Sequence, residues 1–91
     1  MDDEKNNLIY VKAEKNLPKE IRIQIGDELV ISKNVDIKNG DIIAVDLNSN
    51  IILSRIKKVI LRYILIDYSS VVLDINDRRI LGKVIKVVVN V

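Results

Sequence analysis

The chain lacks cysteine, histidine, tryptophan and phenylalanine altogether. The absence of cysteine excludes disulfides, thiolate zinc sites and a cysteine nucleophile. The absence of histidine removes the commonest metal ligand and the commonest general base at neutral pH. Three tyrosines are the only aromatic residues, so the stacking platforms that often accompany nucleic-acid binding are also missing. The sequence therefore predicts neither a metal site nor a cofactor.

Long apolar runs and targeting segments are also missing. No apolar run approaches the roughly 20 residues that a membrane-spanning helix needs. The chain begins with Asp2, Asp3 and Glu4, whereas a secretory leader begins with basic and then apolar residues. We therefore predict a cytoplasmic protein with no membrane partner.

The 91 residues suffice for one small domain, with 48% apolar residues for a core and 31% charged residues for a surface. The apolar set contains 17 isoleucines, 12 valines and 9 leucines. β-Branched side chains lose rotamer freedom in helices and pack well on sheets, so this composition favours β-structure. We predict a flexible N-terminus over residues 1–7 and a single β domain over residues 8–91.

Short apolar segments alternate with turn residues along the whole chain. Ile21, Ile23 and Ile25 alternate with polar residues and give the clearest pattern of a half-buried strand, over residues 20–25. Asn39-Gly40 and Asn48-Ser49-Asn50 are typical of tight turns. The sequence predicts an all-β barrel or sandwich of about seven or eight short strands, over 8–13, 20–25, 29–31, 41–47, 51–60, 62–67, 71–75 and 79–89.

One block of the chain shows a family resemblance. Gly26-Asp27, the apolar strand Leu29-Val30-Ile31, the Asn39-Gly40-Asp41 turn and the stretch to Lys58 follow one another without a gap, and Gly82-Lys83-Val84 opens an apolar closing strand. In this order and spacing the chain resembles the carboxy-terminal domain of LexA-type repressors and the self-cleaving phage repressors. The resemblance implies a small, mostly β fold with a serine nucleophile, a lysine base and a role in dimerisation.

The two catalytic positions of that family are changed in this chain. The position of the serine nucleophile falls at Leu17, and the position of the lysine base, before Arg55, is occupied by Ser54. Leucine cannot attack a carbonyl, and a serine hydroxyl cannot replace a neutral amine as the base. The family's scissile Ala-Gly segment also has no counterpart. We therefore predict that the domain is not an enzyme, and an active LexA-like peptidase is only the third interpretation.

What remains of the family role is self-association through the closing strand, over residues 79–89. Strict alternation puts Ile85, Val87 and Val89 on one face and Val84 and Val88 on the other, and a strand that is apolar on both faces needs cover on both. A homodimer, or a protein partner in a repressor system, would supply that cover. The alternative is a central strand covered by its own chain. The predicted dimer interface consists of Lys83, Ile85, Val87, Val88 and Val89.

A second interpretation is a small DNA-binding β domain of the AbrB/MazE type. The segment Leu17-Pro18-Lys19-Glu20-Ile21-Arg22 and the later Gly40-Asp41 resemble that fold, but the match needs an insertion of about ten residues. The nucleic-acid site residues are unknown, and DNA contact is left open.

Two further sets of charged residues have simple explanations. The basic residues of the second half could face phosphate groups but are explained more simply as a solvated surface: Arg55, Lys57, Lys58, Arg62, Arg78, Arg79, Lys83 and Lys86. Six aspartates could bind a metal ion but are explained more simply as turn residues that bond their own backbone: Asp36, Asp41, Asp46, Asp67, Asp74 and Asp77.

Overall fold

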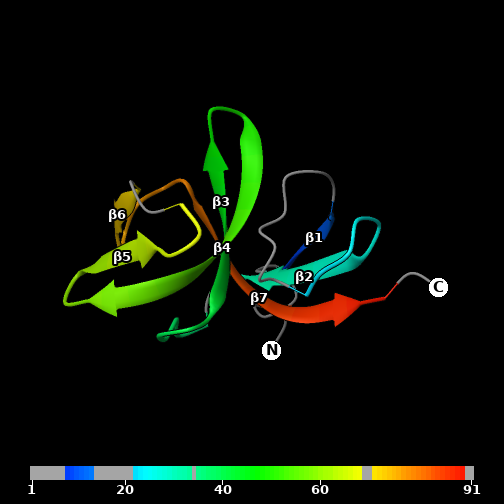
Figure 1. Ribbon diagram of the computed structural model, residues 1–91, viewed down its shortest axis with the longest axis horizontal. Coiled ribbons are helices and arrows are strands. Elements are labelled where there is room, and N and C mark those ends of the chain that lie inside the picture. Colours follow the sequence, from blue (N-terminus) through cyan, green and yellow to red (C-terminus); the bar gives the residue numbers. More distant parts are fainter. Residues whose placement is uncertain (1–7, 14–21, 34, 69–70, 90–91) are drawn as a thin grey trace.

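A computed structural model of the chain describes residues 8–13, 22–33, 35–68 and 71–89. These residues form one antiparallel sheet of seven strands, and no helix occurs among them (Figure 1). The strands are β1 (Leu8–Lys12), β2 (Glu28–Ser32), β3 (Ile42–Leu47), β4 (Asn50–Val59), β5 (Arg62–Leu65), β6 (Val72–Asp74) and β7 (Ile80–Val88). Their order across the sheet is β1-β2-β7-β3-β4-β5-β6, so the last strand lies inside the sheet. The predicted all-β fold of short strands is confirmed.

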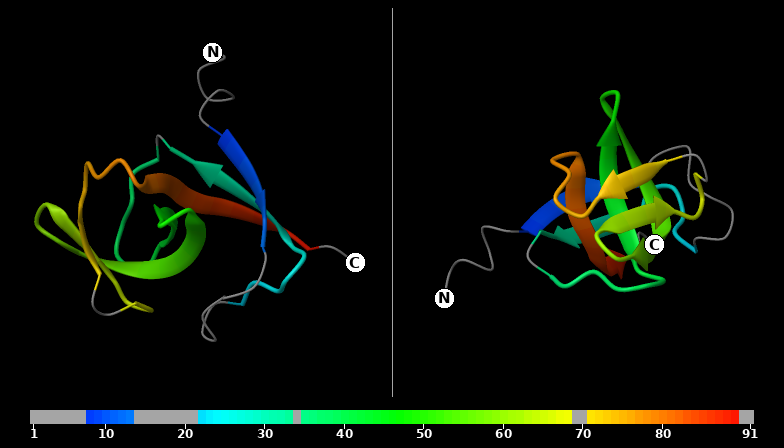
Figure 2. Two further views of the ribbon diagram at one scale, coloured as in Figure 1. Left: turned by 90° about the horizontal axis from the view of Figure 1, so that it is seen from above. Right: turned by 90° about the vertical axis from the view of Figure 1, so that its left-hand side faces the viewer.

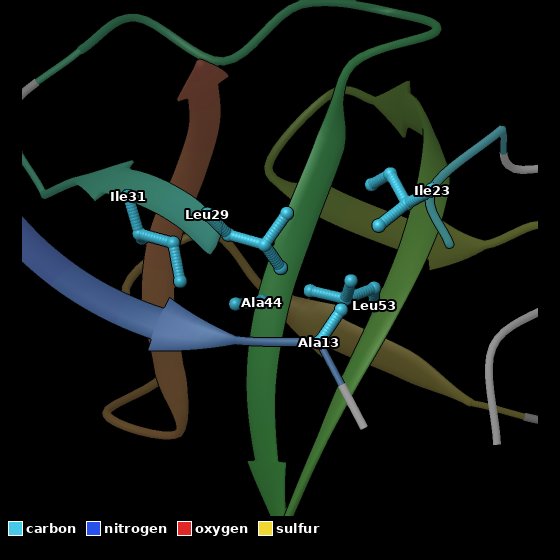
Figure 3. Packing of buried hydrophobic residues seen from close by; sticks show 6 residues of the cluster. All are labelled: Ala13, Ile23, Leu29, Ile31, Ala44 and Leu53. Carbon is cyan, nitrogen blue, oxygen red and sulfur yellow. The ribbon is translucent and has the colours of Figure 1, made fainter. Parts of the chain in front are cut away.

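The sheet curls so that β3 and β4 are covered on both faces (Figures 1 and 2). Ala44 and Leu53 are cross-strand partners and belong to the first core cluster, with Leu29 and Ile31 of β2 (Figure 3). The neighbouring side chains of β3, which alternation directs to the other face, belong to a second cluster with residues of β4, β5 and β6. Burial on both faces explains why β3 is apolar over four consecutive residues, Ile42 to Val45.

Two irregularities bend β7. Ala44 pairs with Gly82 and Val45 with Ile80, which leaves Leu81 as an extra residue opposite β3. Opposite β2, Val30 pairs with Lys86 and Ile31 with Val84, which leaves Ile85 as a second extra residue. Such bulges increase the local twist of a strand. They let one strand take part in both halves of the curled sheet.

Gly82, between these two bulges, has no room for a side chain. Its φ is +148°, and a Cβ atom built on it would lie 2.3 Å from the backbone oxygen of Ser32. Real Cβ atoms do not approach backbone oxygen so closely, so only glycine allows β2 and β7 to meet at this point. The glycine of the predicted closing strand is thus required by close backbone packing.

The predicted strand over residues 20–25 is wrong for its described part, because residues 22–25 form no strand. Ile23 is 7% exposed and packs in the first cluster, whereas Ile25 is 70% exposed. Asp27 causes the difference, because its carboxylate accepts a hydrogen bond from the Gln24 N–H at 3.0 Å and closes a turn there. The predicted flexible segment 1–7 lies outside the described residues.

Candidate functional site

The end of β7 carries several exposed apolar side chains close together. Ile85, Val87 and Val88 are 46%, 37% and 41% exposed, and Val89, just beyond the strand, is 63% exposed. β7 continues here beside β2 and away from β3 (Figure 2, left). We call residues 85–89 the β7 end.

One edge of the β7 end has no strand beside it in the described part of the chain. β2 covers the other edge, through the pairs Val30–Lys86, Leu29–Val87 and Glu28–Val88. β3 pairs with β7 only as far as Lys83. The strand thus presents a free edge with apolar side chains, which is the usual template for adding another strand.

The bulge at Ile85 changes which side chains share a face. Val84 and Val87 are opposite Ile31 and Leu29, which both point into the first core cluster. Val84 and Val87 therefore lie on the same face, three residues apart, and the strict alternation that predicted opposite faces for them is wrong. The bulge adds the one residue that shifts the alternation.

Lys83 differs from the rest of the predicted interface. Its backbone lies between Ser32 of β2 and Ile43 of β3, so both edges of the strand are occupied there. Its ammonium group lies 3.1 Å from the carboxylate of Asp41. Although burial raises the pKa of Asp41, the hydrogen bond from the Lys38 N–H and the ion pair with Lys83 hold this pKa below its ordinary value. The exposed surface therefore begins after Lys83.

Ser54, which the LexA-type resemblance aligned with the lysine base, is fully buried in β4. Its hydroxyl donates a hydrogen bond to the carbonyl oxygen of Arg55 at 2.8 Å and accepts one from the Asp67 N–H at 3.2 Å. The hydroxyl is thus held within a structural network. Leu17, the other changed position, lies outside the described residues.

Asp67 completes this hydrogen-bond network, although the sequence analysis named it only as a turn aspartate. Its carboxylate accepts hydrogen bonds from the backbone N–H, Nε and Nη2 of Arg55, the last at 2.8 Å. The side-chain hydrogen bonds from Arg55 outweigh burial and hold the pKa of Asp67 below its ordinary value. Because Asp67 lies twelve residues from Arg55 in sequence, no local pattern indicates the pair.

The basic residues of the second half are partly neutralised. Arg55 pairs with Asp67, Arg79 with Asp77 at 2.8 Å, and Lys83 with Asp41. Asp77 also accepts a hydrogen bond from the backbone N–H of Arg79. The side-chain and backbone hydrogen bonds from Arg79 together lower the pKa of Asp77 to about 2. This pairing distributes opposite charges along the turns, so these residues do not form one uniformly basic face.

Most of the six aspartates predicted to lie in turns lie in or next to one, but Asp46 lies within β3. Asp41 accepts a hydrogen bond from the Lys38 N–H at 2.7 Å, and Asp74 accepts one from the Asn76 N–H at 3.0 Å. Within the described ranges no three acidic side chains come together as a metal site would require. The segment 17–21, which carries most of the AbrB-like pattern, lies outside those ranges.

No protein-family model matches the chain, and no curated protein matches it significantly in sequence. In the part of the chain that the structure describes, no helix has the length and apolar character to cross a membrane. The geometry of the β7 end is therefore the main basis for assigning a function.

Proposed function

We propose that this protein is a catalytically inactive, LexA-like regulatory domain of a cytoplasmic repressor system, and that it works by forming a homodimer through the β7 end. The observation that carries the proposal is a free strand edge with exposed apolar side chains on both faces, at Ile85, Val87, Val88 and Val89. The changed positions Leu17 and Ser54 support the inactive part of the proposal.

The charge of Lys86 restricts the register of such a dimer. Two β7 ends related by a two-fold axis pair as antiparallel strands, and each residue then faces a fixed residue of the other copy. If the axis passes through Val87, Lys86 faces Val88 of the second copy and Ile85 faces Val89. This register avoids placing the two Lys86 side chains directly opposite each other, which would be destabilising.

The test is the molar mass in solution across a wide concentration range, by sedimentation or light scattering. We expect a concentration-dependent rise from 10.4 kDa to twice that value. Val88→Lys should shift the midpoint of dimerisation to at least about tenfold higher concentration, because the new ammonium group loses its hydration at the interface and faces Lys86 of the second copy. Val72→Lys is the matched control, since Val72 is 50% exposed on the edge strand β6.

Cysteine pairing tests the register. The chain has no cysteine, so Val87→Cys and Val88→Cys each introduce a single thiol. Val87→Cys should form an intermolecular disulfide much faster than Val88→Cys, because residue 87 faces residue 87 of the second copy, whereas residue 88 faces residue 86. A constant monomer mass would contradict the proposed function, and dissociation by Val72→Lys alone would place the contact at β6.

A further inference from the structure

The hairpin between β4 and β5 ends in three exposed aliphatic side chains. Val59, Ile60 and Leu61 are 42%, 83% and 61% exposed, and none of them belongs to either core cluster. Val59 pairs with Arg62, so Ile60 and Leu61 alone form the turn. We call residues 59–61 the apolar tip.

Folding does not explain this choice of residues. Ile60 has a φ of +54°, a conformation that β-branched side chains rarely adopt. Two-residue hairpin turns usually carry glycine, asparagine or aspartate at such a position. A polar turn would therefore suit the hairpin better. A strained turn that exposes aliphatic side chains indicates a role outside the fold.

Basic side chains surround the apolar tip. Lys57 and Lys58 precede it on β4, where alternation directs them to opposite faces of the hairpin, and Arg62 follows it on β5. All three are exposed. The carboxylate nearest in register is Asp74, opposite Arg62. The tip thus combines an apolar end with an excess of positive charge behind it.

The position and shape of the apolar tip favour a lipid bilayer over a protein as its partner. The tip lies at one end of the long axis of the molecule, and β7 ends near the other (Figure 1). A convex tip of this kind has little flat surface for another protein to cover, whereas lipid chains can surround any convex apolar group. Positive residues behind the tip would meet the negatively charged headgroups.

We propose that the apolar tip inserts into the surface of an anionic lipid bilayer, with Lys57, Lys58 and Arg62 at the level of the headgroups. This contact is peripheral and needs no membrane-spanning segment, but it departs from the sequence-based prediction of no membrane partner. It uses neither the β7 end nor Ser54, so it is independent of the proposed dimerisation.

The test is co-sedimentation of the full chain with vesicles of phosphatidylcholine alone and of phosphatidylcholine mixed with phosphatidylglycerol. We expect binding to the mixed vesicles that weakens as salt is added. Because the chain has no tryptophan, Leu61→Trp supplies a single tryptophan at the tip, whose fluorescence can be excited selectively over that of the three tyrosines. Its emission should shift to shorter wavelength on the mixed vesicles.

The decisive variant is the double substitution Ile60→Gly with Leu61→Ser, which removes the aliphatic groups and gives residues that suit the turn. It should fold at least as stably as the parent and bind the mixed vesicles at least about tenfold more weakly. The matched control is Ile51→Ser, because Ile51 is 48% exposed near the β3–β4 turn. This variant should bind like the parent.

Three results would overturn the proposal. The parent chain could fail to bind the mixed vesicles, or bind neutral vesicles equally well. The glycine–serine variant could also keep full binding, which would show that the tip is not inserted. A partner protein with an apolar pocket would be the better interpretation if the chain failed to bind either kind of vesicle.

Discussion

Asp67 is the side chain that most clearly links distant parts of the chain. It follows β5, yet it contacts Ser54 and Arg55 of β4 through its carboxylate and its backbone N–H. Its side chain is 4% exposed, whereas that of Arg55 is 34% exposed, so the carboxylate depends on this pairing for its hydrogen bonds. Ser54 and Arg55 are thus held in one structural contact with Asp67.

Asp67→Asn should lower the free energy of unfolding at neutral pH by roughly 2 kcal/mol, because Arg55 loses its charged partner. The pKa of Asp67 is lowered in the folded protein from its ordinary value of 3.8. Its contribution to stability is therefore present above about pH 4 and is lost as pH falls through the lowered value. The difference between parent and variant should shrink below about pH 4 in denaturant titrations.

The control for this prediction is Asp46→Asn, which removes an exposed carboxylate from β3. Asp46→Asn should change the free energy of unfolding by less than about 0.5 kcal/mol, both at neutral pH and below about pH 4. A constant difference between Asp67→Asn and the parent across the acidic range would contradict the proposed role of the charge.

At the scale of the element, β7 combines two roles that a straight strand could not. Its first half pairs with β3, and its second half pairs with β2 and extends past β3. The bulges at Leu81 and Ile85 produce the bend between the halves, and Gly82 allows the close contact with Ser32. The exposed β7 end is a consequence of this geometry.

Gly82→Ala should lower the free energy of unfolding by roughly 3 kcal/mol, because the new Cβ atom collides with the backbone of β2 and the positive φ is strained. Gly26→Ala is the control. Gly26 also has a positive φ, of +102°, but a Cβ atom there would meet nothing within 4 Å. It should cost about 1 kcal/mol. Equal losses in thermal or denaturant unfolding would show that only backbone strain matters at Gly82.

At the scale of the whole molecule, the proposed functions lie at opposite ends of a two-core sheet (Figure 1). The β7 end belongs to the half that contains β1 and β2, and the apolar tip belongs to the half that contains β5 and β6. A dimer formed through one end leaves the other end of each copy uncovered. Self-association and binding to a bilayer are therefore compatible.

The proposed lack of peptidase activity makes a prediction for the intact chain. At about pH 10 a lysine base would be substantially neutral, and LexA-like self-cleavage would be at its fastest. We expect the mass of the chain to stay unchanged during long incubation, because Ser54 is buried and Leu17 has no hydroxyl. Two fragments that appear in a mass spectrum would show that another nucleophile acts.

The sequence by itself determined the β character and most of the strands, because β-branched composition and turn residues act locally. Asn48 and Ser49 adopt positive φ at the predicted turn, and β3, β4 and β7 lie within a residue or two of their predicted bounds. The tertiary structure alone decided that β7 lies between β2 and β3, that Ile85 is an extra residue and that Asp67 meets Arg55. It also decided that residues 22–25 leave the sheet, where the Asp27 turn outweighs a perfect alternation. These features depend on pairing between residues distant in sequence, and local patterns carry no information about such partners.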